Sequence, residues 1–273
     1  MIQIFKKIMI HYKTPEEIEY IRKSSLLVSE TLATLVEFIK PGQTTKKIDE
    51  IAETFINDHQ AKPAFKGYRG FPATLCISVN EEVVHGIPSD RIIQEGDILS
   101  VDCGVKKDGY FGDSAFTFPV GEVSAEAKKL LRVTLNALYL GIEKAVVGNR
   151  IGDISYAIQE HTQFKHNYGV VRDLIGHGVG KNLHEEPDVP NYGKRGKGLV
   201  LKEGLTIAIE PMINLGTHEV KVLDDKWTIV TRDGRSSAHF EHTIAVGKGM
   251  PQILSDHNLI FEAIKKSDYI SDF

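Results

Sequence analysis

Five ionisable side chains stand at strand-like positions where apolar residues are expected: Asp102, Asp113, His177, Glu210 and Glu241. Taken singly, each is more simply explained as a solvated carboxylate or a structural histidine. Together they are harder to explain in that way, because they lie on four separate segments. Carboxylates with one imidazole suit Mn²⁺, Fe²⁺, Co²⁺ or Zn²⁺, and the lack of thiolate ligands argues against a structural zinc site.

The number of carboxylates indicates more than one ion. Four carboxylates exceed what a single ion needs, and bridging carboxylates are how proteins hold two ions ~3.5–4 Å apart. Such a pair lowers the pKa of a water between the ions and supplies hydroxide near neutral pH. The residue types therefore predict a dinuclear metal centre with hydrolase chemistry.

Two of these carboxylates belong to one predicted β-hairpin, residues 98–118. Asp108-Gly109 is a strong signal for a two-residue type I′ turn. With that turn Gly104 pairs with Asp113, so Asp102 projects from the same face as Asp113, roughly 7–8 Å away at Cα. A three-residue turn would place the two on opposite faces. Taken alone, the hairpin is equally consistent with two exposed aspartates.

The helices that must support these strands can be read from capping signals and apolar spacing. Thr14, Pro15 and Glu17 mark a helix start, and the apolar stripe that follows runs to Ile39, before Pro41-Gly42. Further helices are expected from residue 44 or 45, over residues 123–147 and over residues 153–164. The last of these should bury one side, made of Ala157, Ile158, His161 and Phe164.

Strands are expected at residues 74–79, 206–213, 227–231 and 237–246, with Asp233-Gly234 as a hairpin turn between the last two. Two helices followed by strands occur twice along the chain. Because the strands sit in hairpins, the order indicates an α+β fold with a largely antiparallel sheet and helices on one side. We expect an N-terminal extension over residues 1–13, one catalytic domain over 14–249 and a tail over 250–273.

Composition excludes several classes of protein. The chain has 273 residues, 41% of them hydrophobic, and a formal net charge of −4, which gives no electrostatic case for nucleic acid or anionic membrane as a partner. Its 2 cysteines, Cys76 and Cys103, are too few for a disulfide framework. The start MIQIFKKIMI lacks a sustained apolar region, and no run approaches the ~20 residues of a membrane span. A cytoplasmic protein is expected.

Four segments resemble type I methionine aminopeptidases of the pita-bread metallopeptidase family, in their short bacterial form. They are VDCGVKKDGYFGDSAFTF, GHGVGKNLHEEP, AIEPMI and SSAHFEHTIAV, and they occur in family order. The resemblance implies a curved, largely antiparallel sheet with helices on its outer face and pseudo-twofold halves. It also implies metal ligands at Asp102, Asp113, His177, Glu210 and Glu241, with Asp113 and Glu241 bridging.

The implied reaction is removal of the initiator methionine from nascent polypeptides when the second residue is small. A dimetal-bridging hydroxide attacks the first peptide bond, with Glu210 as general base. His184 is expected to hydrogen-bond the scissile carbonyl and His85 to contact the next amide. The free α-amine would meet the metal, which enforces exopeptidase action.

The implied pocket for the methionine side chain is apolar. Its residues are Phe65, Tyr68, Phe71, Cys76 and Trp227. Some relatives have cysteine where Phe65 stands, so a bulkier pocket entrance is expected here. Asn80 and Ser237 are candidates for holding a monovalent cation. The resemblance further implies two divalent ions (Co, Mn, Fe or Zn), a monomer, and nascent chains at the ribosome as partners.

Three alternatives carry different signals. A pita-bread peptidase for Xaa-Pro bonds usually has a long N-terminal domain, for which roughly thirteen residues before the first helix leave no room. A non-catalytic pita-bread scaffold would have lost metal ligands, whereas all five positions are filled here. An oxygenase with one iron needs a second histidine ligand and has no use for four carboxylates.

Overall fold

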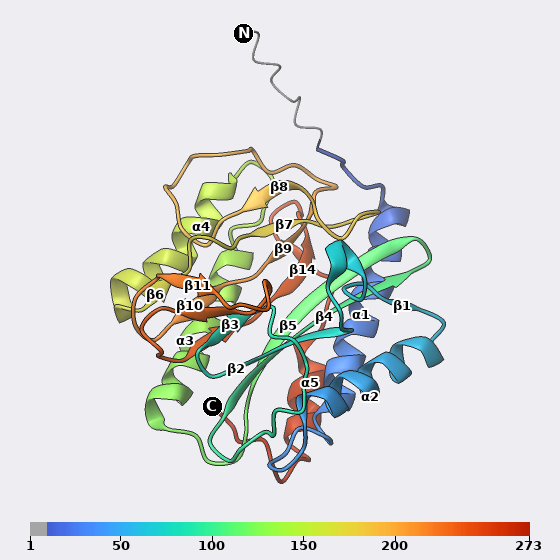
Figure 1. Ribbon diagram of the computed structural model, residues 1–273. Coiled ribbons are helices and arrows are strands. Elements are labelled where there is room, and N and C mark those ends of the chain that lie inside the picture. The colour runs from blue at the N-terminus through green and yellow to red at the C-terminus, as the bar shows by residue number, and fades with distance from the viewer. Residues whose placement is uncertain (1–9) are drawn as a thin grey trace, which may run out of the picture.

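The computed structural model describes residues 10–273, so most of the expected N-terminal extension lies outside the described residues (Figure 1). The helices are α1 (Pro15–Leu35), α2 (Thr45–Asp58), α3 (Ala125–Ile142), α4 (Ile151–Gln159) and α5 (His257–Ile264), with a 3₁₀ turn at Tyr68–Gly70 and a π-helix at Glu160–Phe164. Within the described part of the chain, no helix is long and apolar enough to cross a bilayer.

The strands are short except in one hairpin. They are β1 (Lys62–Pro63), β2 (Leu75–Val79), β3 (Glu82–Val84), β4 (Ile98–Lys107), β5 (Tyr110–Pro119), β6 (Gly169–Val170), β7 (Gly176–Gly178), β8 (Glu185–Val189), β9 (Thr206–Ile209), β10 (Met212–Asn214), β11 (Val220–Val222), β12 (Ile229–Thr231), β13 (Ser237–His239), β14 (His242–Ala245) and β15 (Gln252–Ile253).

The long hairpin β4–β5 confirms the predicted register. Asp108 and Gly109 have φ angles of 51° and 85°, as a type I′ turn requires, and Gly104 pairs with Asp113. Side chains alternate along β4, so Val101 and Cys103 enter the main core on the side of α1. Asp102 therefore faces away from the helices, on the same face as Asp113.

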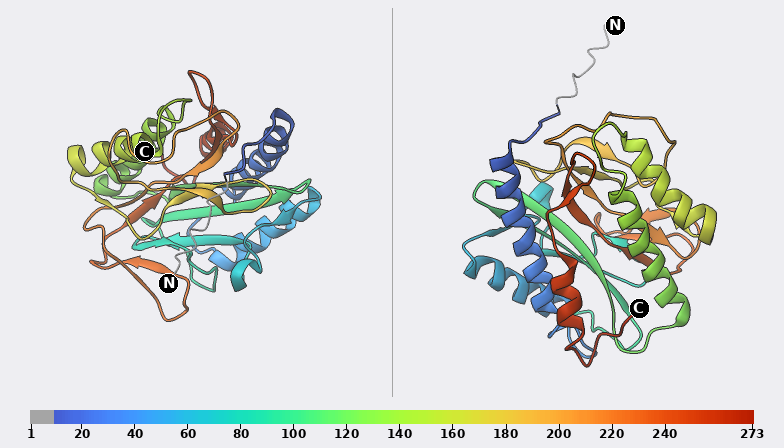
Figure 2. Two further views of the ribbon diagram at one scale, coloured as in Figure 1. Left: turned by 90° about the horizontal axis from the view of Figure 1, so that it is seen from above. Right: turned by 180° about the vertical axis from the view of Figure 1, so that it is seen from behind.

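All pairs of named strands among residues 10–273 are antiparallel. The sheet orders are β1-β4-β2 with β5 on β4, β15-β14-β9-β7-β8, β13-β10-β6 and β11-β12-β3. Helices α1, α3, α4 and α5 lie along one side of the strands, and α2 packs against α1 (Figure 2). The architecture is the expected α+β arrangement with helices on one face.

Two strands predicted as continuous are interrupted, and both breaks fall at candidate metal ligands. Residues 206–213 split into β9 and β10 around Glu210-Pro211, and residues 237–246 split into β13 and β14 around Glu241. Pro211 has no N–H to give to a ladder. After each break the chain moves from one sheet to another, since β9 pairs with β14 whereas β10 pairs with β13. Glu210 and Glu241 thus stand where the two sheets separate.

The predicted start of α1 is confirmed. Thr14 Oγ1 accepts the Glu17 N–H at 3.2 Å, and the Glu17 carboxylate accepts the Thr14 N–H at 3.0 Å. The helix ends at Leu35, before the predicted Ile39, because the Val36 N–H turns to the Ala33 carbonyl and tightens the chain. Ile39 is still fully buried, so the apolar stripe continues past the helix end.

Three other predictions are wrong in part. The third helix ends at Ile142 rather than near residue 147, where the chain forms turns instead. Phe164 does not share the buried side of α4: the π-helix shifts the register, and the ring is 59% exposed. The strands around Asp233-Gly234 do not pair with each other. Instead β12 pairs with β3 and β11, and β13 pairs with β10, because the Ser237 N–H bonds the Asn80 carbonyl and directs β13 past that loop.

Candidate metal centre and substrate pocket

The structure brings all five predicted ligand residues together in one cavity, where the sheet of β9 and β14 separates from the sheet of β10 and β13. Ligand atoms of Asp113, His177 and Glu241 lie within 4.8 Å of one another. His177 Nε2 is 3.5 Å from Glu210 Oε1 and 4.0 Å from Asp113 Oδ2. Asp102 reaches the same cavity from β4 and lines it beside these residues.

Asp113 and Glu241 are buried, Asp102 and Glu210 are partly buried, and several of their oxygens have no hydrogen-bond donor in the described part of the chain. Among the described residues, Oδ1 of Asp102, Oδ1 of Asp113 and Oε1 of Glu241 have no hydrogen-bond partner. Burial raises the pKa of Asp102 and of Glu210 to about 7. Burial, and next the charge of Asp102, raise the pKa of Asp113 well above the ordinary value, and burial, and next the charge of Asp113, do the same for Glu241. Four such groups need protons or cations to neutralise them.

The tautomer of His177 suits a metal ligand. Its Nδ1 lies 2.9 Å from the Gly178 carbonyl, which only accepts, so Nδ1 carries the proton and Nε2 presents its lone pair. That lone pair faces the oxygens of Asp113 and Glu210. A histidine held in this tautomer by a backbone carbonyl is a usual metal ligand, so the five residues fit a site for divalent metal.

Glycines allow the strand that carries His177 to lie close to its neighbours. A Cβ at Gly176 would come within 2.4 Å of the Ala208 carbonyl oxygen, and one at Gly178 within 2.4 Å of the Glu186 carbonyl oxygen. The GHG segment is therefore required by close backbone approach, and it fixes where the ring enters the cluster.

Side-chain hydroxyls connect the two halves of the site. Thr243 Oγ1 donates to the Asp113 carbonyl at 2.8 Å and accepts the Asp113 N–H at 3.2 Å. Ser114 Oγ donates to the Glu241 carbonyl at 2.6 Å, and the Glu241 N–H bonds the Ala115 carbonyl at 2.9 Å. The backbone of Asp113 is thus bonded to the segment that carries Glu241, and the backbone of Glu241 is bonded to the strand that carries Asp113.

An apolar cavity of about 200 Å³ opens onto the cluster, and all twelve predicted site residues line it. Its aromatic wall contains Phe65, Tyr68, Phe71 and Trp227, with Cys76 beside them. The rings of Phe71 and Trp227 meet edge to face at 5.1 Å. Burial, and next Asp102, raise the pKa of the Cys76 thiol, which therefore remains neutral.

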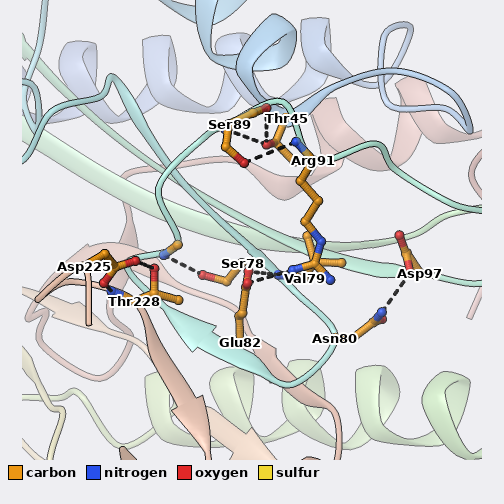
Figure 3. Close-up of polar contacts among 11 residues, drawn as sticks. Thr45, Ser78, Val79, Asn80, Glu82, Ser89, Arg91, Asp97, Asp225 and Thr228 are labelled. Atoms are coloured by element: carbon orange, nitrogen blue, oxygen red, sulfur yellow. Dashed lines mark hydrogen bonds and ion pairs between the residues drawn. The ribbon is translucent and has the colours of Figure 1, made fainter. Parts of the chain in front are cut away.

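His85 enters the pocket from a backbone that is held in an uncommon conformation. Its φ of 60° lies in the left-handed region. The Gly86 N–H donates to Ser78 Oγ at 3.1 Å, and a Cβ at Gly86 would lie 2.2 Å from the Ile77 carbonyl oxygen. Figure 3 shows the surrounding contacts, in which Glu82 accepts the Val79 N–H and pairs with Arg91.

The two histidines expected to contact the substrate, His85 and His184, are neutral near pH 7. Burial, and next His239, lower the pKa of His85 to about 4. Burial, and next His177, lower the pKa of His184 to about 3. His184 Nδ1 shares a hydrogen bond of 2.8 Å with the Tyr68 hydroxyl, and its ring centre is 4.1 Å from that of His177. Its other nitrogen is free to meet a substrate atom.

The main residue that sequence reasoning missed is His239. It is 2% exposed, lines the cavity, and places Nε2 3.6 Å from Glu210 Oε2. A signal existed, because His239 and Glu241 alternate with Phe240 in SSAHFEHTIAV and so belong to one face. The cavity wall also includes Arg69, Val84, Leu174, Ile175, Leu183 and Met212, none of which was predicted, although Leu183 and Met212 lie within two of the motifs.

The candidate cation residues Asn80 and Ser237 lie beside each other, away from the cluster. The Ser237 N–H donates to the Asn80 carbonyl at 2.8 Å, and the Asn80 amide donates to Asp97 Oδ1 at 2.8 Å. Ser237 Oγ lies 2.8 Å from Asn214 Oδ1. These contacts account for both side chains within the protein itself.

A curved antiparallel sheet that encloses one histidine and four carboxylates defines the class of pita-bread metallopeptidases. The sequence profile of metallopeptidase family M24 matches residues 19–248. A prolidase from Pyrococcus furiosus shares the fold with a TM-score of 0.73 at 24% identity, over 90% of this chain and 65% of that one.

Relatives of much higher identity belong to one branch of that class. A methionine aminopeptidase of Clostridium acetobutylicum is 52% identical over 248 residues, 90% of this chain and 99% of that relative. Methionine aminopeptidase 1 of Bacillus subtilis is 51% identical over 238 residues, 87% of this chain and 96% of that relative. The methionine aminopeptidase structure from Thermotoga maritima superposes with a TM-score of 0.89 at 44% identity, covering 91% of this chain and 100% of that one. The chain belongs to the methionine aminopeptidases of metallopeptidase family M24.

Proposed function

We propose that this protein is a methionyl aminopeptidase, which removes the initiator methionine from polypeptides whose second residue is small. The observation that carries the proposal is that the metal-ligand cluster and an apolar pocket share one cavity. A buried cluster of four carboxylates and one imidazole opens directly onto an apolar cavity of about 200 Å³. The high identity to proteins named methionine aminopeptidases supports the same conclusion.

The position of the cavity favours cleavage at the chain end. Its apolar wall of aromatic rings and Cys76 suits an unbranched thioether side chain. A methionine seated there places its α-amine beside the carboxylate cluster, where a positive or metal-coordinating group is favoured. A peptide with residues before the methionine would have to bury them against these charges, so the site favours free N-termini.

Two divalent ions, held by the five ligand residues with Asp113 and Glu241 shared, would supply Lewis acidity and lower the pKa of the attacking water. Glu210 is the residue to accept the proton from that water. Its carboxylate lies 3.5 Å from the predicted ligand His177, so it can reach a water held at the ions.

The two neutral histidines have separate roles. His184 is oriented by Tyr68 and adjoins His177, so its free nitrogen can donate to the scissile carbonyl as negative charge develops there. His85 projects from its strained loop on the Trp227 side of the cavity, where it can contact the amide of the second residue. Neutral rings serve both roles at pH 7 without losing a proton first.

Several finer assignments belong to the proposal. The metal in the cell is Co, Mn, Fe or Zn, since this ligand set accepts each of them. We further propose one catalytic domain over residues 14–249, a monomeric cytoplasmic enzyme, and nascent peptide N-termini at the ribosome as substrates. A monovalent cation near Asn80 and Ser237 remains a prediction.

The test is hydrolysis of Met-Ala-Ser, Leu-Ala-Ser and Ala-Pro-Ala by chelated enzyme with Mn²⁺, Fe²⁺, Co²⁺ or Zn²⁺ added back singly. Metal-dependent release of methionine from the first peptide alone is expected. The Asp113→Ala variant serves as the matched blank for contaminating peptidases. Cleavage of Ala-Pro-Ala would move the protein to the Xaa-Pro branch. Metal binding without cleavage of any peptide would support a non-catalytic scaffold.

A further inference from the structure

The segment that precedes α1 is joined to the loop that carries His184 by a buried ion pair. Lys13 Nζ lies 2.7 Å from Glu185 Oε2, and the two side chains are only 1% and 9% exposed. Most other ion pairs of the described residues lie at the surface, where solvent screens them. Glu185 directly follows His184, so the ion pair connects Lys13 to the loop 180–185, which carries His184.

Two glycines make room for the pair. A Cβ at Gly180 would lie 2.7 Å from both Lys13 Cε and Glu185 Oε1, so a side chain there would displace the two paired groups. A Cβ at Gly204 would lie 2.7 Å from the Lys13 carbonyl oxygen, and the Lys13 N–H donates to the Gly204 carbonyl at 2.6 Å. The backbone and the side chain of Lys13 are therefore both held in place.

The carboxylate of Glu185 also closes the loop itself. Its second oxygen accepts the Asn182 N–H at 3.0 Å, while the Gly180 N–H bonds the Asn182 carbonyl at 3.1 Å. Burial alone would raise the pKa of Glu185, but the hydrogen bonds from Lys13 and Asn182 lower it overall, so the group is ionised. The closed loop places Leu183 in the cavity wall and His184 next to Tyr68.

We propose that Lys13 is a positioning residue: its buried pair with Glu185 anchors the loop 180–185 and so fixes the orientation of His184 toward the substrate carbonyl. This inference rests on the proposed peptidase function of the site. Lys13 touches neither the metal ligands nor the substrate cavity, so its effect on the reaction must pass through the loop. A shift of a reacting group by about 1 Å can lower a rate by ~10²-fold.

The kinetic test compares Lys13→Met in two backgrounds. In the otherwise unchanged enzyme, we expect kcat for Met-Ala-Ser to fall by about 10-fold, with KM within about 2-fold and metal content unchanged. In the His184→Ala background, the same substitution should change kcat by less than about 2-fold, because the group that it positions is already missing. Equal losses in both backgrounds, or no loss in the first, would overturn the proposal.

The matched control is Lys181→Met in the same loop. Lys181 pairs with Glu17 at 3.3 Å, but its side chain is 57% exposed, so this pair should contribute little and kcat should be unchanged. If Lys13→Met does not fold, Glu185→Gln takes its place, since its single amide oxygen can still accept from one of the two donors, Lys13 or Asn182, while the other donor loses its acceptor. A smaller loss of kcat with the same dependence on His184 is then expected, and equal losses in both backgrounds would again contradict the anchor.

Hydrogen exchange of the backbone amides tests the anchor without any use of activity. Lys13→Met should speed exchange at residues 180–186, above all at Asn182, while residues 194–198 in another surface loop exchange as before. Unchanged exchange at residues 180–186 would overturn the anchor whatever the kinetics. Failure of the unmodified enzyme to release methionine with any metal would instead overturn the proposed function, and the exchange result would still decide the role of Lys13.

Discussion

The carboxylate of Glu210 lies between two imidazoles, with His239 Nε2 3.6 Å from one oxygen and His177 Nε2 3.5 Å from the other. His239 Nε2 is buried, and no hydrogen-bond partner for it occurs among residues 10–273. Because the Gly178 carbonyl leaves His177 Nε2 with a lone pair, His239 is the candidate donor to Glu210. We therefore expect His239 to help orient the carboxylate that we propose as the base.

Replacement of His239 by alanine should lower kcat by about 10-fold while metal content is retained, because Glu210 loses the imidazole that lies 3.6 Å from its carboxylate. His239→Gln should retain more activity, since an amide N–H can replace the imidazole donor. Steady-state kinetics on Met-Ala-Ser with metal analysis of both variants checks this. Equal losses in the two would show that the volume of the ring, and not its hydrogen bond, is what matters.

Asp113→Ala or Glu241→Ala should abolish metal binding and activity together. Each residue is almost fully buried at the centre of the cluster, and each is the natural group to be shared between two ions. Metal analysis of the purified variants and assays at saturating Mn²⁺ or Co²⁺ test the expectation. Full turnover in either variant would contradict the dinuclear proposal.

His184→Ala should leave metal content intact and lower kcat by roughly 10²-fold, the usual effect of removing a donor to a developing oxyanion. The ring lies next to His177 but is tied to Tyr68 rather than to the carboxylates. Parallel measurement of bound metal and kcat separates the two roles. Loss of metal in this variant would mean that the assignments of His177 and His184 must be exchanged.

Trp227→Ala should weaken selectivity for methionine with little effect on metal. Trp227 packs edge to face on Phe71 in the cavity wall, so its removal enlarges the apolar pocket. The ratio of kcat/KM for Met-Ala-Ser to that for Leu-Ala-Ser should fall by several-fold. Val222→Ala, an exposed change on the neighbouring β11, is the control, and an unchanged ratio for Trp227→Ala would remove this residue from the pocket assignment.

Chelated protein should lose stability as the pH rises from 6.5 to 8. The folded-state pKa values of Asp102 and Glu210 are raised to about 7, so folding favours the protonated carboxyls, and that stability is lost as the pH passes through the folded-state values. The pKa values of His85 and His184 are lowered to about 4 and 3, so both are already neutral in this range.

Thermal unfolding of the chelated and metal-loaded protein measures this difference. We expect the midpoint of the chelated protein to fall by on the order of 5 °C over this pH range and that of the loaded protein to change much less. Added Mn²⁺ should therefore stabilise the protein more at pH 8 than at pH 6.5. Parallel curves for the two forms would show that metal does not replace protons on these carboxyls.

Local chemistry explains what was predictable from sequence. The register of β4 and β5, and with it the common face of Asp102 and Asp113, follows from the two-residue turn at Asp108-Gly109 and the period of two along a strand. The start of α1 at Thr14 follows equally from its capping residues. The four recognised motifs contain the five predicted ligands and His184, whereas the other predicted residues of the cavity wall followed only from the family resemblance.

Contacts between distant segments were decided only by the tertiary structure. The strands break at Glu210 and Glu241 because the chain passes from one sheet to another at both points, and no local pattern indicates which sheet it will join. The contact of His239 with Glu210 and the pair of Lys13 with Glu185, 172 positions apart, depend on packing that brings separate elements together. Turn type and side-chain alternation are properties of a few adjacent residues, whereas the distance between two strands is set by everything that packs around them.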